Sequence, residues 1–371
     1  MSSLPTQYPL PATRFVKQLE ITIDGRPLVG NRTGIGVHTA EIAGRLAVEP
    51  PPLIASQAEI EDRTEIESCR FRIDRAPNGI LWQQFVLPRI ARSGVLWGPH
   101  GTIPVALRIP SVVTLHDFTS ITMPGRHLLK TVLSFNLFIG RSLERAGRIA
   151  AVSRAIADEA IRSFGVPAAK IEIVPNGVAE FFSPGDHAGL DPYILYVGTL
   201  EPRKGLEDLL FAWNTLPPAR RPRLVLAGDV GWGRASQHLR ERAADDVLRH
   251  YKDIEFTGFV TRERLRELYR GATVFAYPSH FEGFGIPPLE AMACGAPVIA
   301  SRTGAVAEYA GDAALLVRPG DRYALAEALK RLLGSESLRR ELRARGPERA
   351  SHYRWGRSAA MMTDLLGEAA R

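Results

Sequence analysis

The stretch TVFAYPSHFEGFGIPPLEAMACGAPVIAS, residues 273–301, carries the pattern that decides the fold. Its two ends, residues 273–277 and 297–301, are continuous apolar runs of the kind found in strands that are covered on both faces. Between them lie a loop with two glycines and a segment that predicts a helix. A strand, a loop, a helix and a second strand in this order form the repeating unit of parallel α/β domains.

The same order of elements recurs along the chain. Apolar runs predict four further strands in the second half, at residues 193–197, 223–227, 254–257 and 314–317. Five more are predicted in the first half, at residues 19–24, 95–97, 111–115, 148–152 and 170–174. The predicted fold class is therefore α/β, with two doubly wound parallel sheets.

Breaker residues predict the boundary between the two domains. Serine, proline, glycine and aspartate are concentrated between residues 181 and 192, as is typical of a linker. We expect an N-terminal domain at residues 1–180, this linker at 181–192, a C-terminal domain at 193–350 and a helical segment at 351–371. Because open α/β sheets bind ligands at the carboxyl ends of their strands, two such domains predict a functional cleft between them.

The composition excludes several classes of protein. The chain has 371 residues, of which 45% are hydrophobic, so each half can bury a core of its own. Its net charge of +7 favours anionic partners, but the arginines are scattered and do not indicate nucleic acid. The apolar runs are too short to span a bilayer and the first residues lack a signal peptide, so we expect a cytoplasmic protein. Cys69 and Cys294 stand far apart and predict neither a disulfide nor a zinc site.

The loop and helix of the opening stretch have the chemistry of a diphosphate site. Gly283 and Gly285 allow the backbone to approach a ligand closely, and the amides and dipole at the start of a helix favour an anion. Glu290 lies on the predicted helix, where an acceptor-only carboxylate can bind both hydroxyls of a ribose. Glu282 stands eight residues earlier, in the loop. An ordinary capped helix explains neither the glycine pair nor the two glutamates.

This stretch resembles the two-glutamate signature of glycosyltransferase family 4. The resemblance covers nearly the whole second half of the chain and includes three more motifs, GTLEPRKG at residues 198–205, GFV at 258–260 and AGDAALL at 310–316. It implies the GT-B architecture, in which two Rossmann-like domains face a central cleft. The N-terminal domain would bind the acceptor and the C-terminal domain the nucleotide-sugar donor.

The resemblance also implies roles for individual residues. Glu282 would contact the hydroxyls of the donor sugar and Glu290 the ribose, while Arg203 and Lys204 would contact the diphosphate. Such cations stabilise the charge that grows on a departing nucleoside diphosphate, although a solvated basic turn is the plainer alternative. Further predicted donor-binding residues are Gly283, Phe284, Gly285, Gly258, Phe259 and Val260.

No cofactor is expected beyond the nucleotide sugar, which is a substrate. The sequence contains no Asp-x-Asp pair, so a metal ion bridging the diphosphate is not indicated.

In the first half, a glycine-rich segment at residues 30–36 follows a predicted strand and precedes a helix. It matches neither a dinucleotide-binding fingerprint nor a phosphate-binding loop. Family resemblance places Gly34 and Gly36 near the acceptor and the donor phosphate, and an ordinary turn between strand and helix is the alternative.

His116 and Asp117 stand at the carboxyl end of the predicted strand at residues 111–115. They resemble the histidine that the family places beside the donor sugar. A histidine here can donate to a sugar hydroxyl and Asp117 can orient it, whereas ordinary loop hydrogen bonding is the alternative. Nearby, Ser153 is predicted to cap a helix, and Asn176-Gly177-Val178 resembles the family's turn at the domain junction.

The helical segment at residues 126–145 combines apolar and basic residues. Its apolar residues nearly encircle the predicted helix, which favours burial against the sheet. Peripheral contact with the inner face of the cytoplasmic membrane is the alternative, because lipid-linked acceptors are common in the family.

Together with the resemblance, which implies retention of the anomeric configuration, these features predict a retaining, metal-independent hexosyltransferase. The overall likeness to bacterial mannosyltransferases that build polysaccharide repeats favours mannose from GDP-mannose as the donor and a saccharide or lipid-linked saccharide as the acceptor. A UDP-glucose-type donor uses the same motifs and stays open. A sugar-nucleotide epimerase and a non-catalytic nucleotide-binding module are the alternatives from other classes.

Overall fold

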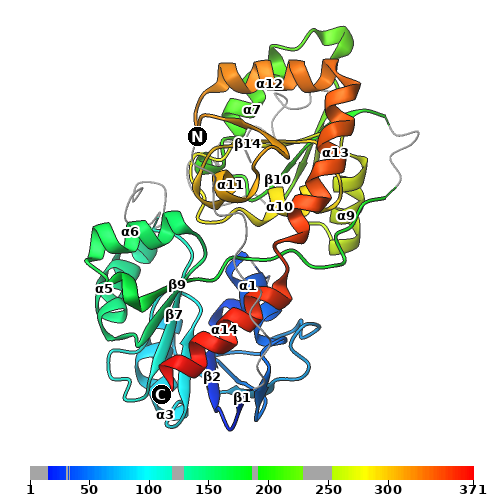
Figure 1. Cartoon of the computed structure of the whole chain (residues 1–371). Coiled ribbons are helices and arrows are strands. Elements are labelled where there is room, and N and C mark those ends of the chain that lie inside the picture. Colours follow the sequence, from blue (N-terminus) through cyan, green and yellow to red (C-terminus); the bar gives the residue numbers. More distant parts are fainter. Residues whose placement is uncertain (1–15, 31, 33, 119–128, 186–190, 229–252) are drawn as a thin grey trace. The chain divides into compact units, whose positions relative to one another are not determined.

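The computed structural model describes residues 16–30, 32, 34–118, 129–185, 191–228 and 253–371. These residues form two compact units (Figure 1). Unit 1 comprises the described residues up to Gly177 together with Tyr353–Arg371, and unit 2 comprises those of Val178–His352. Each unit is built around one fully parallel sheet.

The sheet of unit 1 has seven strands in the order β5-β4-β2-β6-β7-β8-β9. Their bounds are β2 Ile21–Asp24, β4 Leu53–Ser56, β5 Arg70–Ile73, β6 Val95–Gly98, β7 Ser111–Leu115, β8 Arg148–Ala151 and β9 Ile171–Ile173. A separate parallel pair is formed by β1 Val16–Lys17 and β3 Val48–Glu49. The helices are η1 Arg26–Leu28, α1 Gly34–Ala43, α2 Gly79–Leu81, the π-helix η2 Trp82–Val86, α3 Leu87–Ile90, α5 Leu129–Arg145, α6 Arg154–Phe164 and η4 Ala168–Lys170.

Unit 1 also contains α14, Trp355–Ala369, which follows all of unit 2 in the chain. This helix packs on α1 and on β6, β7 and β8 (Figure 1). The Ser358 hydroxyl donates to the Pro175 carbonyl at 2.5 Å, and a Cβ at Gly177 would lie 2.3 Å from the Trp355 nitrogen. The first turn of α14 therefore packs directly against residues 175–177, where the N-terminal part of unit 1 ends.

The sheet of unit 2 has six strands in the order β12-β11-β10-β13-β14-β15. Their bounds are β10 Tyr193–Val197, β11 Arg223–Ala227, β12 Ile254–Gly258, β13 Val274–Tyr277, β14 Val298–Ser301 and β15 Ala314–Val317. The helices are η5 Pro202–Lys204, α7 Leu206–Asn214, η6 Pro218–Arg220, α9 Arg262–Gly271, α10 Ile286–Ala293, α11 Gly304–Tyr309, α12 Arg322–Gly334 and α13 Glu336–Ser351.

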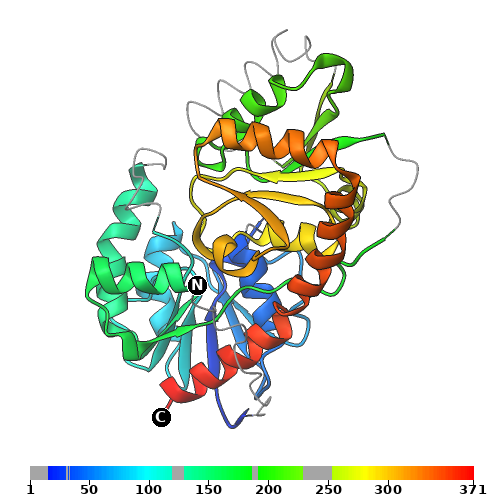
Figure 2. The ribbon, with the colours of Figure 1, turned by 45° about the horizontal axis from the view of Figure 1, so that its top comes forward.

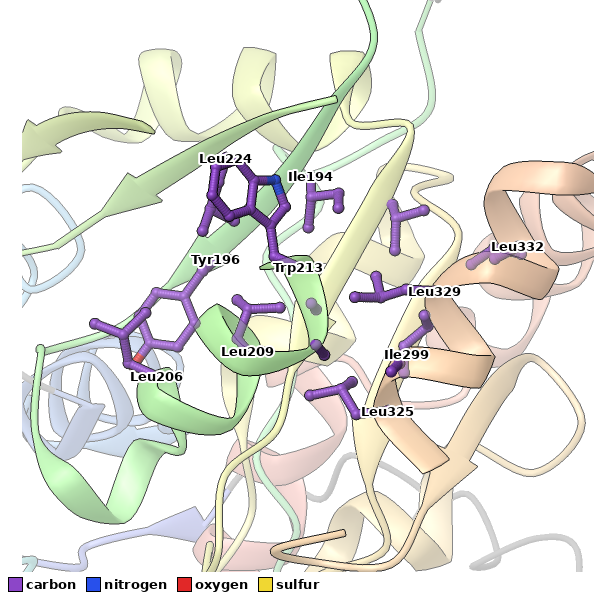
Figure 3. Packing of buried hydrophobic residues seen from close by; sticks show 14 of the residues in the cluster. Ile194, Tyr196, Leu206, Leu209, Trp213, Leu224, Ile299, Leu325, Leu329 and Leu332 are labelled. Carbon is purple, nitrogen blue, oxygen red and sulfur yellow. The ribbon is translucent and has the colours of Figure 1, made fainter. Parts of the chain in front are cut away.

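The core of unit 2 lies between the sheet and the helices α7 and α12. In the turned view α12 lies over the strands (Figure 2). Ile194 and Tyr196 of β10 pack with Trp213 of α7 and Leu329 of α12, and all four are fully buried (Figure 3). The Trp213 indole also donates to the Pro222 carbonyl at 2.8 Å, which satisfies its polar atom.

The strands predicted in both halves are confirmed to within one or two residues. Ser153 caps α6 as predicted, because its hydroxyl accepts from the Ile156 amide at 3.3 Å. Four strands of unit 1 were not predicted: the short pair β1 and β3, and β4 and β5 of the main sheet. Strands β4 and β5 lie between Pro50 and Pro77, where prolines precede β4 and exposed arginines alternate along β5.

The predicted linker at residues 181–192 starts on unit 2 and lies partly outside the described residues. Phe182 is 2% exposed, and its ring centroid lies 5.9 Å from that of Tyr269 in α9. The Arg270 guanidinium donates to the Ser183 carbonyl at 2.8 Å. These contacts attach the chain to unit 2 as soon as it leaves unit 1.

The described apolar side chains of α5 are divided between an exposed and a buried side of the helix. Leu137 is 71% exposed, whereas Ile139 and Leu143 are buried. This part of the helix is therefore amphipathic rather than apolar all round, which differs from the sequence-based expectation. Among the described residues, none of the helices combines the length and apolar character needed to cross a bilayer.

Candidate active site

The predicted donor ligands of unit 2 gather at the carboxyl edge of its sheet. Strands β10 and β13 pair in parallel, so the segments that follow them leave the same edge side by side. The segment after β10 contains Arg203 and Lys204 in the turn η5. The segment after β13 contains Glu282 and leads into α10, where Glu290 lies.

Hydrogen bonds tie these two loops together. The Arg203 carbonyl accepts from the His280 amide at 2.8 Å and from the Ser279 hydroxyl at 3.2 Å. The His280 ring lies 2.6 Å from the Asp208 carboxylate of α7. The backbone that carries the two cations is therefore fixed against the backbone that carries Glu282.

The side chains of the two loops form a compact charged network. Lys204 Nζ lies 2.5 Å from Glu282 Oε1 and donates to the Tyr277 hydroxyl at 3.2 Å. Arg203 lies 2.9 Å from Glu201 and 3.9 Å from Glu282. All four charged side chains are at least four-fifths buried. We call Glu201, Arg203, Lys204 and Glu282 the charged network.

Glu282 stays ionised within this network. Burial by itself would raise its pKa, but the charges of Lys204 and Arg203, with hydrogen bonds from Lys204 and Ser279, bring the pKa below its usual value. The Ser279 hydroxyl donates to Glu282 Oε1 at 2.6 Å. An ionised carboxylate accepts hydrogen bonds, as a ligand for sugar hydroxyls must.

The loop of Glu282 is held by the start of α11. Gly304 has a positive φ of 44°, and a Cβ there would lie 1.9 Å from the Glu282 carbonyl oxygen. The ring of Phe284 is 4% exposed and packs against Tyr309, whose hydroxyl donates to the Gly285 carbonyl at 2.6 Å. Gly283, Phe284 and Gly285 are thus buried supports of this loop, and their contact with a donor stays a prediction.

Glu290 is hydrogen-bonded to a buried tyrosine, Tyr269. Its Oε2 accepts from the Tyr269 hydroxyl of α9 at 3.0 Å, and the glutamate itself is only partly buried. Glu290 lies in α10, eight residues after Glu282 of the loop. The two carboxylates are therefore separate hydrogen-bond acceptors.

Gly258, Phe259 and Val260 lie apart from the charged network. Gly258 is the last residue of the edge strand β12, and Phe259 and Val260 follow it. Strands β10 and β11 lie between β12 and β13. Gly258 has a φ of 67°, and Phe259 is 69% exposed. Phe259 therefore does not belong to the hydrophobic core of unit 2. Its predicted role in donor binding stays a prediction.

In unit 1 the predicted histidine also lies at the carboxyl edge of the sheet. His116 follows β7, and its Nε2 donates to the Pro99 carbonyl at 2.9 Å. A carbonyl only accepts, so the proton of the neutral ring is on Nε2 and the lone pair is on Nδ1. The sequence suggested that His116 donates to a sugar hydroxyl, but the structure uses that donor for Pro99 and leaves Nδ1 as an acceptor.

A second histidine, His38 of α1, supports the first. Its ring centroid lies 4.6 Å from that of His116, at right angles, and about 6 Å from the rings of Trp97 and Trp355. His38 Nδ1 lies 2.7 Å from the Asn176 side-chain oxygen. The sequence analysis did not single out His38, although its place on the buried side of α1 was readable from the spacing of Ile35, His38 and Ile42.

Burial keeps both rings neutral. It lowers the pKa of His116 to about 4, against smaller opposing effects of Pro99 and Asp117. It also lowers the pKa of His38 well below the usual value, and the neighbouring His116 adds to this. Asp117 is half-buried beside His116.

The two predicted glycines of α1 differ in their surroundings. A Cβ at Gly36 would lie 2.5 Å from the Pro27 carbonyl oxygen, whereas one at Gly34 would meet nothing within 4 Å. Gly36 therefore permits α1 to pack on η1, and the contact of either glycine with a ligand stays a prediction.

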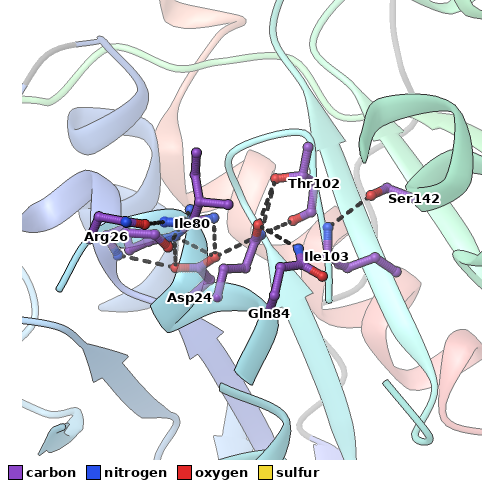
Figure 4. A network of polar contacts seen from close by, with 10 residues as sticks. Asp24, Arg26, Ile80, Gln84, Thr102, Ile103 and Ser142 are labelled. Atoms are coloured by element: carbon purple, nitrogen blue, oxygen red, sulfur yellow. Dashed lines mark hydrogen bonds and ion pairs between the residues drawn. The ribbon is translucent and has the colours of Figure 1, made fainter. Parts of the chain in front are cut away.

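A polar network supports this edge of unit 1 (Figure 4). Asp24, at the end of β2, is fully buried, and its carboxylate pairs with Arg26 at 2.7 Å. Gln83 of the π-helix donates to the Thr102 carbonyl at 2.9 Å and to Asp24 at 3.3 Å. Because a buried charge is costly unless it is paired, this network is best understood as structural.

Within the described residues, no group of three or more histidine, cysteine, aspartate or glutamate side chains could hold a metal ion. The expected absence of a metal cofactor stays a prediction.

Comparison with known proteins covers both units. The family "Glycosyltransferase Family 4" matches residues 33–180, and the family "Glycosyl transferases group 1" matches residues 179–349. The chain is 30% identical to the O-antigen chain mannosyltransferase B of Escherichia coli, over 91% of this chain and 96% of that protein. It is also 30% identical to the E. coli serotype-specific mannosyltransferase WbdA, over 60% of this chain and 29% of that protein.

Solved structures show the same architecture. HepE of Anabaena, in complex with UDP and glucose, superposes with a TM-score of 0.75 at 20% identity, over 94% of this chain and 100% of HepE. The two parallel-sheet units, the family matches and the full-length relative agree. The protein belongs to glycosyltransferase family 4, has the GT-B fold and is a glycosyltransferase.

Proposed function

We propose that the protein is a retaining hexosyltransferase that transfers mannose from GDP-mannose to a saccharide or lipid-linked saccharide acceptor. The product would enter polysaccharide or glycoconjugate synthesis. The observation that carries this proposal is the charged network, in which Arg203 and Lys204 lie beside Glu282 at the carboxyl edge of unit 2.

The proposed reaction breaks the bond between the anomeric carbon and the diphosphate oxygen. Negative charge grows on the leaving diphosphate, and Arg203 and Lys204 would stabilise it from a mostly buried position, where charges interact more strongly than in water. These cations would take the part that a metal ion plays elsewhere. We therefore propose that no metal is needed.

The two glutamates and His116 would hold the rest of the donor. Glu282 would accept from sugar hydroxyls and Glu290 from the ribose hydroxyls. His116 would accept from a sugar hydroxyl through Nδ1, because Nε2 is bonded to Pro99.

The sugar and the base are supported by relatives. Two mannosyltransferases of E. coli support mannose. UDP-glucose is the second candidate, because HepE, which shares the fold, has been solved with UDP and glucose.

A donor panel tests the proposal. Thermal stabilisation by GDP, UDP, GDP-mannose and UDP-glucose would identify the nucleotide, because a ligand that binds only the folded state raises the melting temperature. Hydrolysis of each donor is then measured with and without excess chelator. We expect GDP-mannose to be preferred and activity to persist with chelator. Preference for UDP-glucose would select the second candidate, and strict dependence on a divalent metal would refute the metal-free mechanism.

We also propose that the protein contacts the cytoplasmic face of a membrane through α5, to reach a lipid-linked acceptor. The exposed Leu137 supports this. Co-sedimentation with anionic vesicles should fall for Leu137→Asp and not for Tyr323→Asp, which replaces an equally exposed residue of unit 2. Equal binding by both variants would contradict the proposal.

A further inference from the structure

Three aromatic side chains lie in a row beneath the two glutamates of unit 2. Tyr269 is in the last turn of α9, and Phe275 and Tyr277 are in β13. The ring centroids are 5.5 Å apart from Tyr269 to Phe275 and 6.1 Å apart from Phe275 to Tyr277. All three are at most 2% exposed. We call this row the aromatic ladder.

Each end of the aromatic ladder is linked to one of the two glutamates, directly at Tyr269 and through Lys204 at Tyr277. Tyr269 donates to Glu290 Oε2 at 3.0 Å. Tyr277 accepts from Lys204 at 3.2 Å, and Lys204 in turn pairs with Glu282 at 2.5 Å. The two tyrosines are eight residues apart, as are the two glutamates. The two predicted ligands thus rest on one rigid, buried support.

A buried phenol needs a hydrogen-bond partner, but that partner need not be a charged ligand. Two other buried tyrosines of unit 2 use backbone carbonyls instead. Tyr193 donates to the Leu268 carbonyl at 2.7 Å, and Tyr309 donates to the Gly285 carbonyl at 2.6 Å. Tyr269 differs from them because its acceptor is the carboxylate proposed to bind ribose.

We propose that Tyr269 is a positioning residue for Glu290: its hydroxyl fixes the carboxylate in the orientation that accepts the ribose hydroxyls of the nucleoside diphosphate. The inference rests on the ribose role proposed above for Glu290. Oε2 can accept from Tyr269 and still accept from a ribose hydroxyl, because each carboxylate oxygen has two lone pairs.

Two further features suit Tyr269 to this task. The ring cannot turn away, because Phe182 and Phe275 pack against it with centroids 5.9 Å and 5.5 Å away. Burial, followed by the charge and the hydrogen bond of Glu290, raises the pKa of Tyr269 well above the usual range. The hydroxyl therefore keeps its proton and remains a donor at every working pH.

The test compares Tyr269→Phe with Tyr193→Phe. Each variant removes one buried hydroxyl from unit 2. The hydroxyl of Tyr193 donates to the Leu268 carbonyl, and only that of Tyr269 reaches Glu290. Calorimetry uses whichever of GDP and UDP binds the wild-type protein more tightly, and its 2′,3′-dideoxy analogue.

We expect Tyr269→Phe to weaken binding of the intact nucleoside diphosphate about tenfold, the size of one hydrogen bond to a charged group. Binding of the dideoxy analogue should be unchanged, because it has no ribose hydroxyls to lose. Tyr193→Phe should keep the wild-type preference for the intact ribose. In a Glu290→Ala background, Tyr269→Phe should have no further effect.

The possible results separate this inference from the ribose assignment. If Glu290→Ala abolishes the preference for the intact ribose and Tyr269→Phe retains it, Tyr269 is only a core residue and the inference fails alone. If Glu290→Ala also retains the preference, the ribose assignment fails with it. Equal weakening of both nucleotides by Tyr269→Phe would show general loosening and would also refute the inference. Should Tyr269→Phe not fold, Tyr269→Met fills the space without a hydroxyl and must give the same ribose-selective loss.

Discussion

Lys204 and Glu282 form an ion pair, with 2.5 Å between the ammonium nitrogen and the carboxylate oxygen. Two residues with different proposed ligands, a diphosphate and a sugar, therefore determine each other's position. Arg203 and Glu201 complete a network of two positive and two negative charges. Substituting either Lys204 or Glu282 removes the ion-pair partner of the other. The effect of a single substitution here therefore includes the loss of the ion pair.

Removing one cation should slow the reaction strongly. We expect Arg203→Ala and Lys204→Ala each to lower kcat by about two to three orders of magnitude, by analogy with the loss of one preorganised charge stabiliser. Initial rates with a saturating donor measure this. Arg223→Ala is the matched control, because it removes an exposed arginine of unit 2 that pairs with Glu255. Near wild-type rates in both Arg203→Ala and Lys204→Ala would contradict the leaving-group role.

The two glutamates should give different kinetic effects. Glu290→Ala should weaken nucleoside diphosphate binding, and Glu282→Ala should chiefly lower turnover, because only Glu282 is assigned to the reacting sugar. Calorimetry with the diphosphate and steady-state kinetics separate the two. Unchanged diphosphate affinity in Glu290→Ala would remove its assignment.

The product should keep the anomeric configuration of the donor. An inverting enzyme needs a general base on the face opposite the leaving group, and the residues proposed for chemistry, Glu282, Arg203 and Lys204, are assigned to the donor. With retention, the departing diphosphate oxygen would take the acceptor proton. The anomeric carbon–hydrogen coupling of the first-formed product, measured by NMR, decides this. A β-linked product from an α-linked donor would require a base, and Asp117 would be the first to test.

His116 should make stability depend on pH. Its pKa is about 4 in the folded protein and about 6.5 when unfolded. Between these values the unfolded chain binds more protons, so the free energy of unfolding rises with pH through this window and is constant above it. From pH 7 to pH 5 the wild-type protein should lose about 1–2 kcal/mol more than His116→Asn. Urea unfolding at both pH values measures this, and an identical loss in the variant would contradict it.

The two glycines of α1 should respond differently to alanine. Gly36→Ala should lower the free energy of unfolding by about 1–3 kcal/mol, since the new methyl group would meet the Pro27 carbonyl at 2.5 Å. Gly34→Ala should be neutral or slightly stabilising, because its surroundings are open and alanine favours a helix. Urea unfolding measures the free energy of unfolding of both variants. Equal values would contradict the prediction and would show that α1 can shift on η1 without loss of stability.

The sequence predicted most of the sheet in unit 2 because its strands are buried on both faces and are therefore apolar throughout. It missed β5 for the opposite reason, whereas β4 is largely buried and was missed because of the prolines before it. The edge strand β5 exposes Arg70 and places Phe71 only half inside, so its pattern is weak. The prolines at 50–52 also suggest a break where β4 begins after them.

Most of the candidate site was predicted from motifs, but the residues beneath it were not. Glu282 and Glu290 belong to a local sequence signature. Tyr269 and His38 are instead distinguished by hydrogen bonds to residues on other elements. Tyr269 meets Glu290 only because α9 and α10 pack side by side. His38 meets Asn176 across 138 positions of sequence. Such pairs follow from the packing of elements, which short motifs do not contain.

The return of α14 to unit 1 has a consequence for synthesis on the ribosome. All strands of unit 2 emerge in one uninterrupted segment, while unit 1 must wait for Trp355 and the helix that covers β6, β7 and β8. Although its strands are made first, unit 1 is the last to complete its packing. A nascent chain that stops before residue 353 therefore holds a finished second unit and a first unit in which β6, β7 and β8 lack the cover of α14. A chaperone or protease can recognise such a state.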